Sequence, residues 1–369
     1  MLALAYANGA NDVSKAIATL VGSGVTQYRT AVLWGTLWTA LGAVASASLA
    51  TAMLKTFTTG LFTTEADSPI VLGAAVIGGA ILWVLFASWQ GLPVSTTHAI
   101  IGGISGGGVV ALGVNGIAWP NLAAKVIVPL ALSPVAAFAV TWALTPVLAA
   151  TLGRWQGYCV CLQPSVGVVI AIDPKGKSRF LYQNGFSGSS GIVAATPQQC
   201  GEARLAGLTV SMDSVHWLSS GAASFARGLN DAPKIVALML IFLASGGPAH
   251  QMPLPVVFVL GAVAMGIGSF FGGRRVTAVL AEKVTTMDHV EGLAANLTTS
   301  ALVSATAVMG LPVSATHVSG SAIIAIGARK GRAAIRWATV REIVLAWLLT
   351  VPVAAVLAGL LVLLLRPII

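Results

Sequence analysis

Long apolar runs separated by short polar stretches make up most of this chain of 369 residues. A run of about 20 apolar residues can cross a bilayer as a helix. Two runs, 1–24 and 216–245, are each interrupted by a polar Gly-Asn-Asp cluster, which predicts broken helices. The other runs lie at 29–54, 69–89, 93–114, 121–152, 252–273, 291–309, 312–328 and 342–365. The pattern predicts an all-α polytopic membrane protein of ten segments, some of them broken or re-entrant.

The stretch 153–213, between the fifth and the sixth segment, differs from the rest because it is polar and contains a Gly/Ser-rich patch. Two runs at 166–172 and 178–182, joined by a Pro-Lys-Gly turn, predict a small β-hairpin within it. We therefore expect three parts: an N-terminal transmembrane repeat at 1–152, a compact β-containing insert, and a C-terminal transmembrane repeat at 214–369.

The composition narrows the class of protein. Hydrophobic residues make up 56% of the chain and charged residues only 8%, whereas a soluble domain has about 25% charged residues. So few charges cannot cover a surface in water, which excludes a soluble enzyme and a disordered chain. The three cysteines, Cys159, Cys161 and Cys200, lack the spacing of a zinc site, and neither a disulfide nor a metal framework is expected.

The lysines and arginines sort by side of the predicted membrane. If each segment crosses once, 14 of the 20 fall on the side opposite the N-terminus, three on the other side, and three within segments. Cytoplasmic loops carry the excess of Lys and Arg. We therefore expect a multi-pass protein of the cell (inner) membrane, with both termini outside and the insert in the cytosol. The net charge of +9 then gives no reason to expect a nucleic-acid partner.

Two sequence motifs occur twice. Gly9–Lys15 recurs at Gly228–Lys234, and Gly91–His98 recurs at Gly310–His317, with the same offset along the chain in both cases. The second motif keeps seven of its eight residues. Because each half has five segments, an odd number, the second copy enters the membrane upside down. The duplication predicts an inverted-topology repeat with a site near the midplane, where the paired motifs meet.

Two acidic residues, Asp12 and Asp231, lie inside apolar segments and are repeat mates. A carboxylate at membrane depth is costly and is kept mainly for function, although capping a half-helix is the structural alternative. With the preceding Asn11 and Asn230, they supply hard oxygen donors that suit Na⁺ or a proton as coupling ion. These four residues are the predicted coupling-ion site.

Basic side chains lie beside the acids. Lys15 and Lys234 follow the acids by three residues, so each can pair with its Asp, fill the volume of a sodium ion, or face a substrate anion. His98 and His317 can relay protons or donate to the anion, with simple packing as the alternative. Arg227 is matched by Asn8 in the first half, which breaks the symmetry of the repeat, and it can hold the insert or the anion.

The Gly-Leu-Pro-Val-Ser motifs are predicted to begin helices, with Pro93 and Pro312 in the first turn. A helix N-terminus carries unsatisfied N–H donors and a partial positive charge, which together make an anion site. Two such ends approaching from opposite sides can hold a tetrahedral oxyanion, although simple capping is the structural alternative. The hydroxyl side chains predicted to bind it are Ser95, Thr96, Thr97, Ser314 and Thr316.

The duplicated Gly-x-Asn-Asp and Gly-x-Pro-Val-Ser-x-Thr-His motifs resemble the inorganic phosphate transporter (PiT) family over 1–152 and 214–369. The resemblance implies inverted repeats, outward-facing termini, a homodimer, and phosphate uptake coupled to Na⁺ or H⁺. By position it assigns the Asn-Asp pairs to the coupling ion and the five hydroxyls to the substrate. Lys15 and Lys234 depart from the family pattern, and a lysine-bearing branch resembles bacterial members that carry sulfate.

The leading hypothesis is a secondary active phosphate transporter, coupled to Na⁺ or H⁺ and working by alternating access. A sulfate permease of the same architecture is the alternative, because sulfate can only accept hydrogen bonds whereas phosphate can also donate one. A membrane hydrolase using Ser95 or Ser314 is disfavoured, since catalysis needs one activated serine and not two copies in opposite orientations. A passive anion channel is a third alternative. We expect no enzyme activity and no cofactor beyond the coupling ion.

Overall fold

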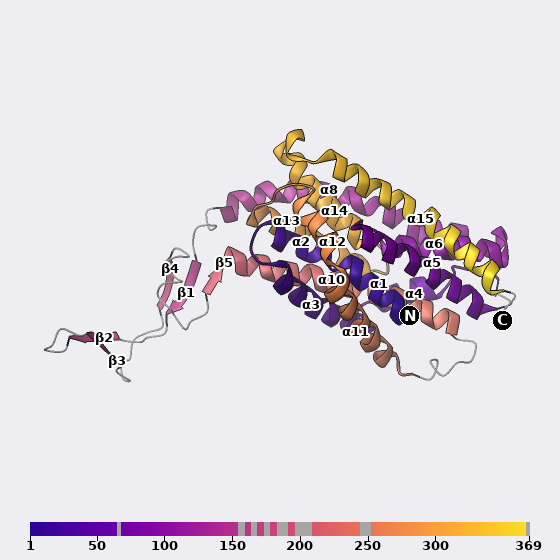
Figure 1. Cartoon of the computed structure of the whole chain (residues 1–369), viewed down its shortest axis with the longest axis horizontal. Helices are drawn as coiled ribbons and strands as arrows, with labels where there is room; N and C mark the ends of the chain where they lie inside the picture. Colours follow the sequence, from indigo (N-terminus) through magenta and orange to yellow (C-terminus); the bar gives the residue numbers. More distant parts are fainter. Residues whose placement is uncertain are drawn as a thin grey trace.

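The computed structural model describes residues 1–64, 68–153, 159–163, 168–172, 178–182, 191–195, 209–243 and 252–366. The described part is mostly helical, and the helices pack into one elongated bundle (Figure 1). Before residue 153 the helices are α1 (Leu2–Asp12), α2 (Ser14–Gly22), α3 (Tyr28–Leu49), α4 (Thr51–Thr58), α5 (Pro69–Gln90), α6 (Thr96–Leu112), η1 (Val114–Gly116), α7 (Trp119–Leu122), η2 (Ala123–Ile127) and α8 (Val128–Leu152). After residue 211 they are α10 (Met212–Leu243), α11 (Leu254–Gly272), α12 (Arg274–Glu282), α13 (His289–Val308), α14 (Ala315–Lys330), η5 (Arg332–Ala334) and α15 (Trp337–Leu365).

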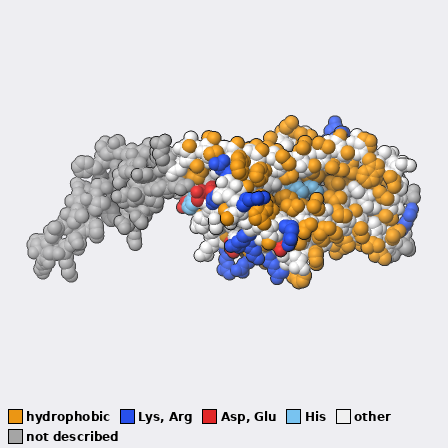
Figure 2. All heavy atoms as spheres, turned by 90° about the horizontal axis from the view of Figure 1, so that it is seen from above, with side chains coloured by type: hydrophobic (Ala, Val, Ile, Leu, Met, Phe, Trp, Pro, Cys, Tyr) orange, Lys and Arg blue, Asp and Glu red, His pale blue; other side chains and the backbone are white. Residues whose placement is uncertain are grey.

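The predicted helical membrane class is confirmed by the length and surface of these helices. Within the described residues, five stretches are long and apolar enough to cross a membrane: Tyr28–Leu49, Pro69–Gln90, Trp119–Leu152, Leu254–Gly272 and Trp337–Leu365. Large hydrophobic side chains are exposed along them, including Leu132, Phe271 and Leu348. In Figure 2 hydrophobic atoms cover much of the described surface, and most of the visible Lys and Arg gather over one half of the bundle. Such an apolar surface suits contact with lipid rather than water.

Helix α10 differs from its prediction. The Gly-Asn-Asp cluster was expected to break the 216–245 segment, but α10 is continuous from 212 to 243, with Pro233 inside it. In the first half the break is a single residue, Val13, whose backbone dihedral angles stay in the helical region. The predicted break in the second half is therefore wrong. The Asn and Asp side chains find partners on neighbouring segments, so they do not compete with the helix for its own backbone.

Each Gly-Leu-Pro motif lies between two helices. Gly91 and Gly310 end α5 and α13 with φ of 79° and 71°, a left-handed conformation that favours glycine. The chain then runs extended to Ser95 and Ser314, the N-caps of α6 and α14. In both caps the serine Oγ accepts a hydrogen bond from the backbone N–H three residues later, at 3.2 Å. The predicted helix starts are present, one at the same place in each half.

The two prolines of these motifs do not occupy the predicted positions. Pro93 and Pro312 lie in the extended segments, two residues before the N-cap, and not in the first helical turn. The fixed φ of proline also suits extended backbone, and serine is the stronger N-cap residue. The helices therefore begin later than predicted.

Elements in the second half follow those of the first at the constant offset of the motifs. On this offset α5 matches α13, α6 matches α14, α3 matches α11, and α1 with α2 matches α10. The contacts are exchanged between the halves: α15 packs against α6 while α8 packs against α14, and α10 packs against α3 while α1 packs against α11. The two halves are thus interleaved around a shared interior.

Two glycines that are repeat mates allow close contacts between these helices. A Cβ at Gly9 on α1 would lie 2.0 Å from the carbonyl oxygen of Met265 on α11. A Cβ at Gly228 on α10 would lie 2.1 Å from the carbonyl oxygen of Thr39 on α3. Since no side chain fits at these distances, glycine brings the motif-bearing helices against the backbone of their neighbours.

Strands occur between α8 and α10. Strand β1 (Cys159–Gln163) pairs antiparallel with β4 (Gly191–Ala195) and β5 (Thr209–Ser211), and β2 (Val168–Ile172) pairs antiparallel with β3 (Ser178–Tyr182). They lie beyond one end of the bundle, whereas the end of α15 lies at the other (Figure 1). Much of the predicted insert, Cys200 included, lies outside the described residues, so the domain boundaries stay a prediction.

Candidate functional site

Asp12 on α1 and Asp231 on α10 lie close together inside the bundle, with 3% and 4% of their surface exposed. The amide nitrogen of Asn8 is 2.6 Å from Oδ2 of Asp12 and 3.1 Å from Oδ2 of Asp231. One side-chain amide therefore donates to both carboxylates. The fold brings the two repeat-matched acids to one place, although they are far apart in the sequence.

Both predicted lysine partners are present and buried. Lys15 forms an ion pair with Asp12, and Lys234 lies 3.3 Å from Oδ1 of Asp231. The four charged groups are almost completely removed from solvent. A buried charge without a partner is strongly destabilising, so in each pair the aspartate and the lysine depend on each other for their burial.

Asn11 and Asn230 connect α1 and α10, the helices that carry the two acids, to the extended segments before α6 and α14. The Nδ2 of Asn11 donates to Ser88 Oγ at 2.9 Å and to the carbonyl oxygen of Leu92 at 3.0 Å, while its Oδ1 accepts from the N–H of Val94 at 3.1 Å. In the second half, Asn230 donates to the carbonyl oxygen of Val313 at 3.2 Å. These contacts fix the starts of α6 and α14 beside the acids.

The hydroxyls at the two helix starts join the same cluster. Thr96 donates to Asp12 Oδ2 at 3.3 Å, and Thr97 accepts from the Lys234 ammonium at 2.8 Å. Thr316 donates to the carbonyl oxygen of Val94 at 2.8 Å, from the other half. The cluster therefore joins two helix N-termini, each with a serine cap and a neighbouring threonine, to both carboxylates.

His98 and His317 lie in contact with each other. Their ring centroids are 4.3 Å apart, and the His317 ring is 4.2 Å from that of Trp347. Among the described residues, Nδ1 of His98 and Nε2 of His317 have no hydrogen-bond partner. Contact between two repeat mates places these rings where the two halves meet, next to the helix starts.

The repeat offset matches Asn8 with Arg227, but the sequence assigns no role to Asn8 and no defined partner to Arg227. Arg227 is 1% exposed, and its Nη2 donates to Thr39 Oγ1 at 2.7 Å and lies 3.5 Å from Ser269 Oγ. Its Nε and Nη1 have no partner among the described residues, and its charge interacts with both carboxylates. No local sequence pattern indicates the bridging role of Asn8, because it depends on α1 and α10 lying side by side in the fold.

The cluster as a whole can bind an anion. Among the described residues its buried charged groups are three cations and two carboxylates, which sum to +1. The helix N-termini add neutral donors that suit an oxyanion. So do the hydroxyls of Ser95, Thr97 and Ser314, which accept in the hydrogen bonds above, whereas Thr96 and Thr316 already donate theirs. The same described part holds no group of three His, Cys, Asp or Glu side chains that could bind a metal ion.

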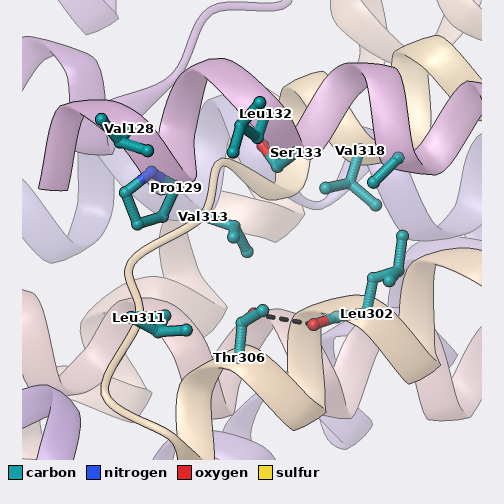
Figure 3. A pocket seen from close by; sticks show the side chains of 10 residues that line it. Val128, Pro129, Leu132, Ser133, Leu302, Thr306, Leu311, Val313 and Val318 are labelled. Atoms are coloured by element: carbon teal, nitrogen blue, oxygen red, sulfur yellow. Dashed lines mark hydrogen bonds between the residues drawn. The ribbon is translucent and has the colours of Figure 1, made fainter. Parts of the chain in front are cut away.

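A separate cavity of about 250 Å³ lies between α8, α13 and α14 (Figure 3). Its two hydroxyls are already bonded to their own helices, Ser133 to the carbonyl oxygen of Leu130 and Thr306 to that of Leu302. It therefore offers no free donor to an anion. The side chains around it are Val128, Pro129, Leu132, Ser133, Ala136, Leu302, Thr306, Leu311, Val313 and Val318.

Comparison with known proteins gives one consistent family. A model described as "Phosphate transporter family" matches residues 8–358. The "Probable low-affinity inorganic phosphate transporter" of Mycobacterium tuberculosis is 29% identical over 97% of this chain and 74% of its own length. The protein of the same description from Bacillus subtilis is 26% identical over 97% of this chain and 92% of its own.

A solved structure titled "The sodium-dependent phosphate transporter" has a similar fold. The TM-score is 0.75 and the sequence identity 23%, with 100% of this chain and 97% of that chain covered. At this identity the likeness concerns the fold alone. The helical architecture of the described residues is thus one that a known transporter also has.

Proposed function

The chain belongs to the phosphate transporter family, and on that premise we propose that it is a secondary active transporter of inorganic phosphate in the cell (inner) membrane. The observation that carries the proposal is the duplicated cluster in which two buried carboxylates meet two serine-capped helix starts. Transport is driven by a cation gradient, Na⁺ or H⁺, moving in the same direction as the anion. The same family relationship gives no reason to assign an enzyme activity.

The substrate site lies at the starts of α6 and α14. Each start offers N–H donors and a partial positive charge without the desolvation cost of a full countercharge. The excess positive charge that Arg227 brings to the cluster adds a long-range attraction for the anion. The hydroxyl side chains assigned to substrate binding are Ser95, Thr96, Thr97, Ser314 and Thr316.

The coupling ion is assigned to Asn11, Asp12, Asn230 and Asp231, which are buried and share one hydrogen-bond network. A protonated phosphate oxygen can donate a hydrogen bond to a carboxylate. Because the proposed cation and anion sites are adjacent, binding of one ion affects the binding of the other. His98 and His317, whose rings are in contact, are assigned as a proton relay.

Two inverted repeats, 1–152 and 214–369, form the transport pathway. The exchanged helix contacts between the halves support this symmetry, because a twofold axis in the membrane plane relates each contact to its mate. The insert at 153–213 is assigned to the cytosol and both termini to the outside, from the sorting of Lys and Arg. Rocking of one repeat against the other opens the site to alternate sides, and the protein works as a homodimer in the bilayer.

Uptake of radiolabelled phosphate into proteoliposomes tests the proposal, with and without a Na⁺ or a pH gradient. Uptake that accumulates phosphate only under a gradient supports it. Uptake that is insensitive to both gradients indicates a passive channel. Unlabelled sulfate is the competitor: if it displaces phosphate at equal concentration, the sulfate permease is the better description, because sulfate needs only donors from the site.

A further inference from the structure

The ammonium group of Lys15 lies inside a shell of oxygen atoms. Besides the Asp12 carboxylate, it contacts the side-chain and backbone oxygens of Asn11 at 2.6 and 3.0 Å and the carbonyl oxygen of Val94 at 3.2 Å. The lysine side chain is 2% exposed. Backbone carbonyls, an amide oxygen and a carboxylate are the ligands that a buried Na⁺ takes in transporters built from repeats.

A second oxygen shell of the same kind lies in the other half. The Lys234 ammonium contacts Thr97 Oγ1 at 2.8 Å, the carbonyl oxygen of Val313 at 3.0 Å and Oδ1 of Asp231 at 3.3 Å. Val313 is the repeat mate of Val94, at the offset that relates the two copies of each motif. The two oxygen shells share a carboxylate and a valine carbonyl oxygen, while Asn11 completes the first and Thr97 the second. Each already holds one positive charge.

An ammonium and a sodium ion compete for such a shell. A lysine ammonium is a compact unit charge with three donors and no acceptor, so it is satisfied by the oxygens that would ligate the metal ion. To enter, Na⁺ would have to displace a tethered group whose charge would stay within the same buried cluster. The entropy of binding also favours the lysine, because it is held in place by the chain.

The charge balance of the cluster points the same way. With both lysines protonated, the five buried charges among the described residues sum to +1, and an anion meets a positive site without any metal ion. Without the two lysines, the two acids and Arg227 would sum to −1. Such a site would need to bind a cation before it could hold an anion.

We propose that Lys15 and Lys234 act as built-in cations in the place of coupling sodium ions, and that this chain works without Na⁺. The inference rests on the proposed phosphate transport and goes beyond it, since it removes one of the two coupling ions left open there. The proton then remains as the driving ion.

The first test uses the unmodified protein in two assays. Phosphate uptake into proteoliposomes under a fixed pH gradient is measured in NaCl and in choline chloride, and the thermal unfolding midpoint is measured in detergent with the same two salts. We expect no difference between the salts in either assay. Uptake that requires Na⁺, or a rise of the midpoint specific to Na⁺, overturns the proposal, because a ligand that binds the native state stabilises it.

The second test empties the shells one at a time. Lys15→Ala and Lys234→Ala leave the oxygens in place without the ammonium, so that Na⁺ can enter. We expect each variant to gain a Na⁺-specific rise in unfolding midpoint and a Na⁺ stimulation of uptake within the usual range of coupled sites, about 5- to 150-fold. Lys55→Ala is the matched control, since Lys55 is an exposed lysine of α4 and should respond to Na⁺ like the unmodified protein. Folded variants that ignore Na⁺ in both assays overturn the proposal.

Failure of this inference and failure of the proposed function look different. Absence of phosphate uptake in every salt and gradient rejects phosphate transport, while the unfolding midpoints still report whether Na⁺ enters the shells. Uptake that is present but depends on Na⁺ rejects only the inference. If a lysine variant does not fold, the two assays on the unmodified protein decide.

Discussion

The two halves of the molecule agree closely in one region and differ in another. At the starts of α6 and α14 the serine caps, the left-handed glycines and the histidines are equivalent, and both cap hydrogen bonds measure 3.2 Å. On α1 and α10 the matched positions diverge: Asn8 faces both carboxylates in the first half, where the second half has Arg227. The caps at the two helix starts are therefore symmetric, and the charged region beside them is not.

This difference has a physical cause. An oxyanion has several equivalent acceptors, so two identical donor sets around it are a good solution. Charge is different: the Asp–Lys pair is neutral and occurs in both halves, whereas an arginine in both halves would raise the net charge of the buried cluster to +2. With asparagine at position 8 in place of a second arginine, the net charge of the cluster is +1, and the Asn8 amide bridges the two acids. Four sets of substitutions test this comparison, in order of decreasing expected effect.

Removing one carboxylate should have the largest effect. Asp12→Asn leaves the Lys15 ammonium buried among neutral oxygens, and breaking such a pair costs about 3–5 kcal/mol of unfolding free energy. Asp231→Asn should cost less, because Asp231 lies 3.3 Å from its lysine and also accepts from Asn230 at 2.7 Å. Both variants should lose phosphate uptake. Thermal unfolding in detergent and proteoliposome uptake measure the two effects.

Asp213→Asn is the control for the acidic variants, since Asp213 is an exposed acid at the beginning of α10. It should keep the stability and uptake of the unmodified protein. Equal or smaller destabilisation by Asp12→Asn than by Asp213→Asn would contradict the buried ion pair as drawn from the structure.

Neutralising Arg227 should have the next largest effect, on anion affinity. Arg227→Gln lowers the charge of the cluster from +1 to zero while keeping a donor near Thr39. Because the variant loses a buried unit charge beside the proposed anion site, KM for phosphate should rise about tenfold, which corresponds to about 1.4 kcal/mol. Arg275→Gln, at an exposed arginine, is the matched control. An unchanged KM would show that the asymmetric charge does not act on the substrate.

Alanine substitution at two glycines that are repeat mates should show that packing differs between the halves even where the sequence is the same. A Cβ at Gly42 on α3 would lie 2.0 Å from the carbonyl oxygen of Phe225, whereas its repeat mate Gly261 on α11 has open space. Gly42→Ala should therefore destabilise by about 1–3 kcal/mol through overpacking. Gly261→Ala should be neutral or slightly stabilising, by up to about 1 kcal/mol, since alanine favours helix. Similar unfolding midpoints for both variants would contradict the difference in packing.

The sequence predicted the parts of the site that depend on local pattern. Apolar runs gave the helices, and the constant offset identified Asp12 with Asp231 and Ser95 with Ser314 as equivalent. The helices and their caps depend on residues near one another in the chain, where periodicity and capping rules apply, and the offset compares two such local motifs.

The parts that the sequence did not predict depend on contacts between distant segments. The bridge from Asn8 to Asp231 joins α1 to α10, and the partners of Arg227 belong to α3 and α11. The continuity of α10 across its Gly-Asn-Asp cluster has the same origin, because packing outweighs the weak helix propensity of those residues. The roles of the site residues stay predictions that the substitutions test.

The serine caps should show the smallest effect, and the same one in both halves. Ser95→Ala and Ser314→Ala each remove one N-cap hydrogen bond, which costs about 1 kcal/mol of unfolding free energy. Because the two bonds have the same length, the two losses should agree, and Ser48→Ala at an exposed serine should have little effect. Thermal unfolding of the three variants and of Ser95→Thr, which keeps an acceptor, measures this. A loss confined to one half would mean that only one helix start is structured by its cap, and the symmetric region would then be as asymmetric as the charged one.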